Sequence, residues 1–241
     1  MEKIDEGSIL ESLSGNNEQI FEHLAYILQD LWELGGGKEE LIDIIKRNFR
    51  DDLSDLRILD LCCGKGANLI TLSKELGCSG LGIDLFAPFI EDAKNTVNKL
   101  QIDKKIEFLV LDIRDAVREY NDYDLVLYGN DTNVLGDEET TIKSVLNCCK
   151  KGGFLLYHTS GDTCASKFNL IDSLVISQER KREINNYNNI CIKNRCYELV
   201  EKFPQKKEMF VKYIEQQENE SEELINNMNW CYYLIKNESN G

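Results

Sequence analysis

An α/β fold built on a mostly parallel sheet is the architecture that this sequence of 241 residues predicts. Between residues 57 and 159, short apolar runs alternate with segments of helical periodicity. Continuously apolar strands that alternate with helices of about ten residues or more are typical of a parallel sheet with helices on both faces. The composition agrees, because 42% of the residues are hydrophobic and only two are proline, which suits a folded domain without a long linker.

Each element of this core is assigned in order from its pattern. The predicted strands cover residues 57–61, 79–84, 106–111, 123–128, 154–159, 173–177 and 230–235. The predicted helices between the first five strands cover residues 67–76, 88–100, 114–120 and 137–150. Right-handed crossovers join parallel strands, whereas we expect the last strand to add antiparallel at the sheet edge. The prediction is a Rossmann-like, mostly parallel seven-stranded sheet with helices on both faces and an antiparallel last strand.

Helical segments are predicted on either side of this core. Residues 1–50 form an N-terminal helical cap, and residues 51–241 form the main domain. In the cap, apolar side chains recur at helical spacing over residues 18–34, and the glycines 35–37 end that helix by accepting a left-handed conformation. A helical insertion of two charged helices occupies about residues 179–227.

Two aromatic residues of the cap are candidate substrate contacts. Tyr26 projects from the polar side of the predicted helix, and Trp32 lies close to its end. Both could face a substrate if the cap closes over a pocket as a lid hinged at the glycines. The alternatives are an exposed tyrosine, which is common, and a tryptophan at the edge of the core.

The charge balance disfavours nucleic acid and anionic membrane surfaces as partners. The net charge is −15, whereas nucleic-acid binding depends on lysine and arginine set against phosphates. The densest basic run, Arg180-Lys181-Arg182, is flanked by glutamates and indicates a solvated helix face. No apolar run approaches the 18 residues of a membrane span and no signal peptide is recognisable, so we expect a cytoplasmic protein.

Cysteine usage supports the same compartment and predicts no metal site. Nine cysteines is an odd number, which favours reduced thiols over a disulfide framework. Cys191 and Cys196 have no neighbouring histidine or second cysteine pair of the kind that zinc requires.

Several polar and glycine residues follow the predicted strands, where open α/β sheets bind their ligands. Gly64 and Gly66 follow the first strand, and glycine lets the backbone turn tightly and approach a ligand. Asp84 ends the second strand, where a carboxylate could accept both hydroxyl groups of a ribose. The third glycine of the dinucleotide fingerprint is replaced by Leu69, and no Walker phosphate loop is present. These features suit a nucleoside that lacks phosphates.

The segments at residues 58–66, 80–85 and 109–113, with the glycine turn at 152–153, resemble the motifs of the class I S-adenosylmethionine-dependent methyltransferases. The resemblance covers about residues 57–159 and implies transfer of a methyl group from this cofactor to a small molecule. The residues that it implies for cofactor binding are Asp60, Cys62, Gly64, Gly66, Asn68, Asp84, Leu85, Asp112, Ile113, Tyr128 and Asn130. Cys62 departs from the family pattern, which usually has glycine there.

Candidate catalytic residues follow the fourth and fifth strands. They are Tyr128, Asp131 and His158, because the methyl group should emerge beyond the fourth strand. His158 has the unperturbed pKa nearest neutrality, but a structural role is the alternative. Asn130 and Asp131 could instead shape the loop, and Asp112 could cap a helix.

Three alternatives to a small-molecule methyltransferase stay open. They are a methyltransferase that acts on protein or tRNA, a non-catalytic protein that binds the cofactor, and a nucleotide-dependent oxidoreductase. The charged helices at 179–227 could shape the pocket or contact a second subunit in a homodimer.

Overall fold

The computed structural model describes residues 5–13, 15, 18–49, 53–102, 106–129 and 133–238. The chain divides into two compact units. The sheet unit comprises residues Glu33–Ile176 and Trp230–Gly241, and the helical unit comprises Met1–Trp32 and Ser177–Asn229. Each unit is described by itself.

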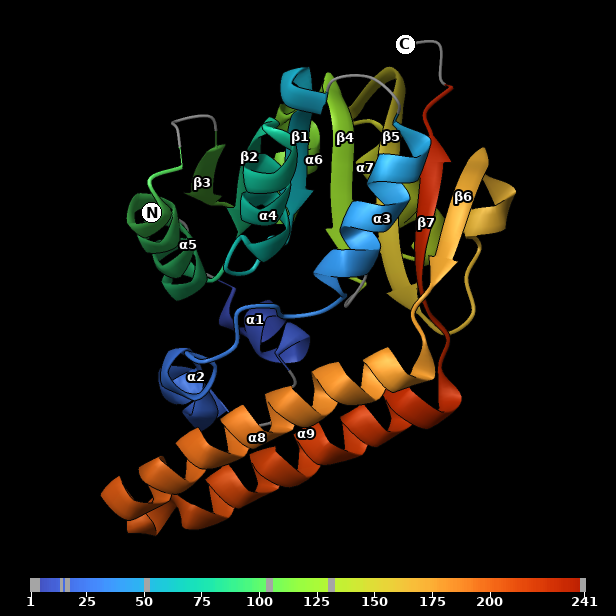
Figure 1. The fold of residues 1–241 in the computed structure, drawn as a ribbon. Helices are drawn as coiled ribbons and strands as arrows, with labels where there is room; N and C mark the ends of the chain where they lie inside the picture. The colour runs from blue at the N-terminus through green and yellow to red at the C-terminus, as the bar shows by residue number, and fades with distance from the viewer. Residues whose placement is uncertain are drawn as a thin grey trace. The chain divides into compact units, whose positions relative to one another are not determined.

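A seven-stranded sheet forms the centre of the sheet unit, with the strand order β3-β2-β1-β4-β5-β7-β6 (Figure 1). The strands are β1 (Arg57–Leu61), β2 (Ser79–Asp84), β3 (Ile106–Val110), β4 (Tyr123–Gly129), β5 (Cys149–Ser160), β6 (Leu170–Val175) and β7 (Trp230–Lys236). All pairs are parallel except the two that β7 forms, with β5 and with β6, which are antiparallel. The predicted Rossmann-like fold class is therefore confirmed, but β7 lies between β5 and β6 rather than at the edge.

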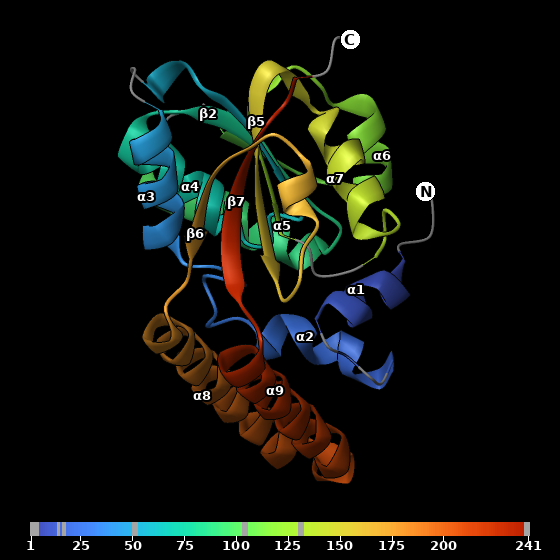
Figure 2. The ribbon, with the colours of Figure 1, turned by 90° about the vertical axis from the view of Figure 1, so that its right-hand side faces the viewer.

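Helices cover both faces of this sheet, as predicted. The helices α3 (Lys38–Asn48), α4 (Ala67–Leu76) and α5 (Ala87–Leu100) lie on one face, and α6 (Ile113–Glu119) and α7 (Glu138–Leu146) lie on the other (Figure 2). A continuous cluster of buried apolar side chains from β1, β2, β4 and β5 packs against α6 and α7. Because successive strand residues point to opposite faces, the other residues of these strands face α3, α4 and α5.

The boundary between α7 and β5 differs from the prediction. The helix ends at Leu146 instead of residue 150, and β5 begins at Cys149 instead of residue 154. Cys149 already pairs with Tyr123 of β4, and a register irregularity follows in β4 between Tyr123 and Leu125. The pattern of the sequence missed this start, because the exposed Lys150 and Lys151 interrupt the apolar run.

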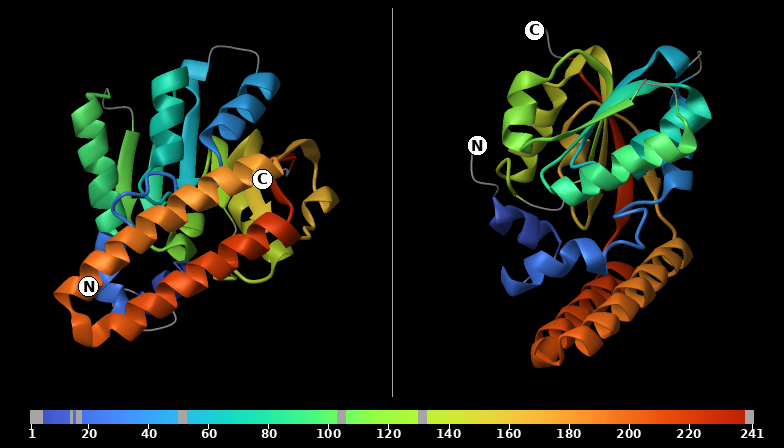
Figure 3. Two further views of the ribbon diagram at one scale, coloured as in Figure 1. Left: turned by 60° about the horizontal axis from the view of Figure 1, so that its bottom comes forward. Right: turned by 90° about the vertical axis from the view of Figure 1, so that its left-hand side faces the viewer.

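The helical unit contains α1 (Glu6–Ser12), α2 (Phe21–Ile27), α8 (Gln178–Lys202) and α9 (Lys207–Asn227). The last two helices form a long antiparallel hairpin (Figure 3). The prediction of one helix over residues 18–34 is wrong, because α2 ends at Ile27 with Leu28 as its C-cap. The glycines 35–37 therefore do not cap it.

Polar contacts between distant parts of the sequence connect the members of the helical unit. Arg195 of α8 donates to Asp30 at 2.6 and 2.9 Å, and the hydroxyl of Tyr26 donates to Glu198. Lys181 is 7% exposed and donates to the carbonyl oxygens of three residues at the end of α9, namely Leu224, Ile225 and Met228, at 3.3, 3.2 and 2.8 Å. For Lys181 the prediction of a solvated face is therefore wrong.

Within the described ranges, no helix combines the length and the apolar character that a bilayer span requires.

Candidate active site

A tight loop joins β1 to α4 and defines one side of the candidate site. Cys62, Gly64 and Gly66 all have positive φ, at 57°, 54° and 74°. Only glycine adopts this left-handed region without steric cost. Cys62 is therefore strained at this position, and its side chain is exposed.

The glycine at position 66 is required by packing inside the protein. A Cβ atom built there would lie 2.5 Å from the ring of Phe108 and 3.2 Å from Cβ of Ala93. Gly82 of β2 faces the same ring, and a Cβ there would also lie 2.5 Å from Phe108. A side chain at position 66 would therefore meet protein atoms, and cofactor binding by the backbone at Gly66 and by Cys62 stays a prediction.

Asp84 holds this loop at the end of β2. Its carboxylate accepts hydrogen bonds from the backbone N–H of Gly64 and of Phe86, both at 2.8 Å. Burial raises the pKa of Asp84, whereas these backbone bonds lower it. The N-cap residue of α5 is Phe86, and no side chain caps that helix, so Asp84 is not a helix cap. The carboxylate is fixed beside the glycine loop, as the sequence indicated.

Asp60 of β1 lies next to Asp84 and the glycine loop, on the same face of the sheet. It pairs in register with Gly82 of β2 and is 3% exposed. Among the described residues, no hydrogen-bond partner reaches its Oδ2 atom. Burial, with the nearby charge of Asp84, raises the pKa of Asp60 to about 8. A buried acid of this kind suits a ligand that brings a positive charge.

Asp112 caps α6, which was the alternative to adenine binding. Its carboxylate accepts hydrogen bonds from the backbone N–H of Arg114 at 2.8 Å and from Nε of the Arg114 side chain at 2.9 Å. Ile113 is buried in the apolar cluster under α6. The roles of Asp112 and Ile113 at an adenine ring stay predictions.

His158 lies near the end of β5, on the face of the sheet that α3 covers, and is surrounded by aromatic rings. Its ring centroid is 4.5 Å from that of Tyr232 and 5.3 Å from that of Trp230. Burial lowers the pKa of His158 to about 3, so the imidazole is neutral at physiological pH. Its Nε2 atom has no hydrogen-bond partner within the part of the chain that the structure describes.

The other candidate site residues do not gather beside Asp60, Asp84 and His158 in the described part of the chain. Tyr128 is 3% exposed and belongs to the apolar cluster on the opposite face, where its ring stacks on Tyr157 at 6.2 Å. Asn130 and Asp131 lie outside the described residues. Asn68 and Leu85 are half-buried.

Tyr26 and Trp32 belong to the helical unit. The Tyr26 ring lies beneath the guanidinium of Arg195, at 5.6 Å, and the ammonium of Lys202, at 5.3 Å. Its hydroxyl donates to Glu198, so its known contacts are to α8.

The segment from Leu34 to Gly37 is a part of the site that sequence reasoning missed. A Cβ on Gly64 would lie 3.0 Å from Cδ1 of Leu34, so this side chain packs on the glycine loop. A Cβ on Gly36 would overlap the Tyr232 hydroxyl and lie 3.6 Å from Cε1 of His158. The three successive glycines were a signal, but their closeness to Tyr232 depends on a contact across almost the whole chain.

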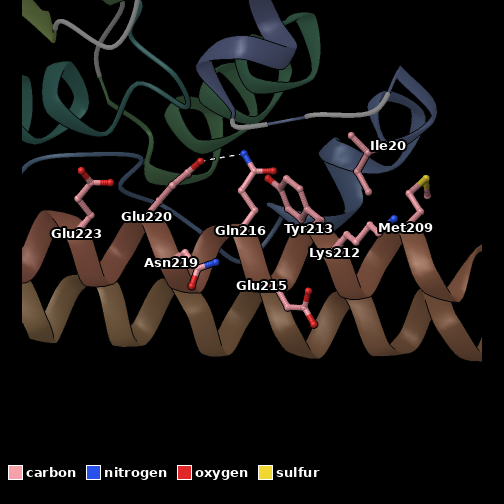
Figure 4. A pocket seen from close by; sticks show the side chains of 9 residues that line it. All are labelled: Ile20, Met209, Lys212, Tyr213, Glu215, Gln216, Asn219, Glu220 and Glu223. Carbon is pink, nitrogen blue, oxygen red and sulfur yellow. Dashed lines mark hydrogen bonds between the residues drawn. The ribbon is translucent and has the colours of Figure 1, made fainter.

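A groove in the helical unit is a weaker candidate. It has a volume of about 600 Å³ and runs along α9 (Figure 4). Two of its polar contacts lie within the unit: Gln216 donates to Glu220 at 2.9 Å, and the hydroxyl of Tyr213 donates to the carbonyl oxygen of Leu13 at 3.0 Å. These contacts account for part of the polar lining without a ligand.

Comparison with known proteins agrees with the position of the site in the sheet unit. Residues 58–153 match a family model described as a methyltransferase domain. A demethylmenaquinone methyltransferase from Lactococcus lactis subsp. lactis (strain IL1403) is 30% identical over 158 residues, which cover 64% of this chain. The chain spans 58% of the length of that relative.

Solved structures share the fold at low sequence identity. A SAM-dependent methyltransferase from Thiobacillus denitrificans, in complex with S-adenosyl-L-homocysteine, has a TM-score of 0.73 and 15% identity, covering 88% of this chain and 97% of that one. A phosphoethanolamine N-methyltransferase from Haemonchus contortus, in complex with S-adenosyl-L-methionine, has a TM-score of 0.67 and 19% identity, covering 99% of this chain and 61% of that one.

Proposed function

We propose that this chain, which belongs to the class I S-adenosylmethionine-dependent methyltransferases, binds S-adenosylmethionine (SAM) at the carboxyl ends of β1 and β2 and transfers its methyl group to a small-molecule acceptor. The fold alone does not determine the reaction, because one fold supports many chemistries. The proposal therefore rests on the site.

One observation carries the proposal: the carboxylate of Asp84 is fixed by the N–H groups of Gly64 and Phe86, both at 2.8 Å, where the strand order reverses between β1 and β4. An ionised carboxylate has further lone pairs, which can accept the two hydroxyl groups of a ribose. The loop lacks the third glycine of a pyrophosphate site. A nucleoside without phosphates fits both features.

Asp60 supports a cofactor that carries positive charge. Its buried Oδ2 atom has no partner among the described residues, and its pKa is raised to about 8. A nearby cation favours the ionised form of a carboxyl group, so a bound ammonium or sulfonium would compensate for the burial of Asp60.

Bound SAM supplies an activated methyl group, whose bond to sulfur breaks with the electron pair remaining on sulfur while the acceptor atom forms the new bond. The residues of the chain then have to bind the two reactants, orient them and exclude water. Orientation of two reactants can lower a barrier by about 7–11 kcal/mol. We propose that orientation is the main catalytic contribution here.

Proton transfer has a smaller part in this proposal. A general base works best when its pKa is close to the operating pH, whereas the pKa of His158 is lowered to about 3. We therefore propose that His158 contacts the acceptor and that Asp131 is the candidate proton acceptor. Catalysis by Tyr128 stays a prediction, although its burial in the apolar cluster gives it a structural role.

The predicted closing of residues 1–50 as a lid, with Tyr26 and Trp32 against the substrate, stays a prediction. The same holds for cofactor binding by Asn68, Leu85 and Asn130, for a homodimer and for a cytoplasmic location.

Two measurements test the proposed function. Calorimetry should detect binding of SAM and of S-adenosylhomocysteine, and no binding of NAD or ATP. Label from methyl-labelled SAM should then pass into a small molecule, and demethylmenaquinone is the first acceptor to assay because of the Lactococcus relative. Label in protein or tRNA would instead favour a macromolecular acceptor, and binding without transfer to any extract would favour a non-catalytic SAM-binding protein.

A further inference from the structure

An exposed apolar face runs along α8 in the helical unit. Among the described residues of that unit, the exposed large hydrophobic side chains are Tyr187, Ile190 and Tyr197, with exposed fractions of 58%, 60% and 49%. All three belong to α8, and spacings of three and seven residues place them on one side of it. A single exposed hydrophobic side chain is ordinary on a protein surface, but several in one line are typical of an interaction surface.

The opposite side of α8 is already buried within the unit. Ile192, Cys196 and Leu199 are at most 3% exposed, and the helix packs along α9 and against α2 (Figure 3). A helix at a protein surface typically has one apolar stripe, whereas α8 has large hydrophobic side chains on two opposite sides. The second stripe is expected where a helix has a second neighbour.

The distribution of charge along α8 favours a second copy of this chain as that neighbour. Residues 184–192, which include Tyr187 and Ile190, contain no charged residue. The net charge of −15 makes two copies repel each other. An uncharged surface is therefore where two copies can approach with the least repulsion.

The charged residues near the two ends of α8 favour one orientation of the pair. A two-fold dimer brings the same surface of both copies together. In a parallel pair, Glu201 would face Glu201 of the other copy. In an antiparallel pair centred on Ile190, Arg180 of one copy approaches Glu201 of the other, because these two residues lie almost equally far from Ile190 in opposite directions. Arg180 also pairs with Glu183 of its own helix at 2.7 Å, so it would lie between two carboxylates.

We propose that α8 is the contact surface of a homodimer, in which the faces formed by Tyr187, Ile190 and Tyr197 of two copies pack together in antiparallel orientation. A stripe of about three helical turns buries less area than the roughly 1,200–2,000 Å² of a stable interface. The dimer should therefore dissociate in the micromolar range. This contact is separate from the proposed cofactor site, which belongs to the sheet unit.

Sedimentation equilibrium of the full chain, across micromolar concentrations, measures this monomer–dimer equilibrium. Ile190→Glu places a negative charge at the centre of the contact in both copies and should raise the dissociation constant by more than about tenfold. Tyr197→Ser adds no charge and should raise the constant in the same direction. Val175→Glu is the matched control, because Val175 is a 64% exposed side chain of the sheet unit, and it should leave the equilibrium unchanged. All three variants should unfold near the wild-type temperature, since the replaced side chains are exposed.

Charge reversal tests the orientation of the two helices. Arg180→Glu and Glu201→Arg should each weaken the dimer by about two- to fivefold, the effect expected of exposed ion pairs. The double variant restores opposite charges and should regain the wild-type dissociation constant. In a parallel pair like charges meet before and after each reversal, so neither single variant would weaken the dimer.

Three results would overturn the inference. A wild-type chain that stays monomeric at all these concentrations would assign the apolar face to a different partner. A dimer that Ile190→Glu and Tyr197→Ser leave intact would have its contact on another surface. Weakening by both single charge variants, without recovery in the double variant, would contradict the antiparallel pairing.

Discussion

The sheet unit and the helical unit differ in how completely their buried polar side chains are paired. In the helical unit, the buried polar side chains of His23, Lys181, Asn185 and Ser221 all have hydrogen-bonding partners inside the unit. In the sheet unit, Asp60 and His158 each keep a buried atom without a partner among the described residues. A buried polar group without a partner costs about 1–3 kcal/mol. We propose that the helical unit uses these polar groups for stability, whereas Asp60 and His158 of the sheet unit serve a ligand.

The largest expected change in stability comes from substituting Gly66 in the sheet unit, where the cost of packing can be separated from the cost of backbone strain. Gly66→Val should lower the free energy of unfolding by about 2–6 kcal/mol, the sum of overpacking against Phe108 and of backbone strain at a φ of 74°. Gly152 is the matched control, because its φ is 75° and no atom lies within 4 Å of its Cβ position. Gly152→Val should therefore show the strain alone, about 1–3 kcal/mol. Urea denaturation measures both, and equal losses would mean that Phe108 simply moves aside.

A pH series tests the unpaired carboxyl group of Asp60. Its pKa is about 8 in the folded chain and about 3.9 when unfolded. Between these values only the unfolded chain ionises this group, so the contribution of Asp60 to the stability of the unliganded protein should fall as pH rises through that window and level off above it. Asp60→Asn cannot ionise and should be more stable than the wild type at high pH, by about 3 kcal/mol.

His158 acts in the opposite direction, which the same series should reveal. Its pKa is lowered from about 6.5 to about 3, so the contribution of His158 to stability should fall as pH drops through that range and should offset the change from Asp60 where the two ranges overlap. His158→Phe should remove the loss on the acid side only. Thermal unfolding temperatures of the wild type and the two variants across pH are the readout. A wild-type curve that stays flat from weakly acidic to alkaline pH would show that neither group is buried as described.

Substitutions at two lysines of α8 test whether a buried polar contact stabilises the helical unit more than an exposed one. Lys181 donates to three carbonyl oxygens at the end of α9, whereas the exposed Lys193 pairs with Glu218 at 2.9 Å. Lys181→Met should destabilise the hairpin by about 1.5–3 kcal/mol, and Lys193→Met by at most about 1 kcal/mol. Hydrogen exchange in α8 and α9 measures both. Similar effects of the two variants would contradict the structural role of Lys181.

The sequence predicts those features of the molecule that depend on residues close together in the chain. The helix from Ala67 to Leu76 matches its predicted bounds, because its limits are glycines with positive φ at 66 and 77. Asp84 could be placed beside the glycine loop because strand order and spacing determine both positions.

The contacts that the sequence did not predict join distant segments. Lys181 looked like part of a solvated run because its partners at the end of α9 are more than 40 residues away. The approach of Gly36 to Tyr232 spans almost 200 residues. The end of α2 at Ile27 was missed because the apolar side chains at Leu28 and Leu31 continue the helical spacing and are buried without being helical.

The most direct test of the central claim is the SAM affinity of an Asp84→Asn variant. Calorimetry on a folded variant should show a loss of about ten- to a hundredfold, because a hydrogen bond to a charged group contributes about 1.5–3 kcal/mol. Asp172→Asn on β6 is the control, since Asp172 bonds to Arg47 and Asn48 of α3, and it should bind SAM like the wild type. Unchanged SAM affinity in folded Asp84→Asn would contradict cofactor binding at the ends of β1 and β2.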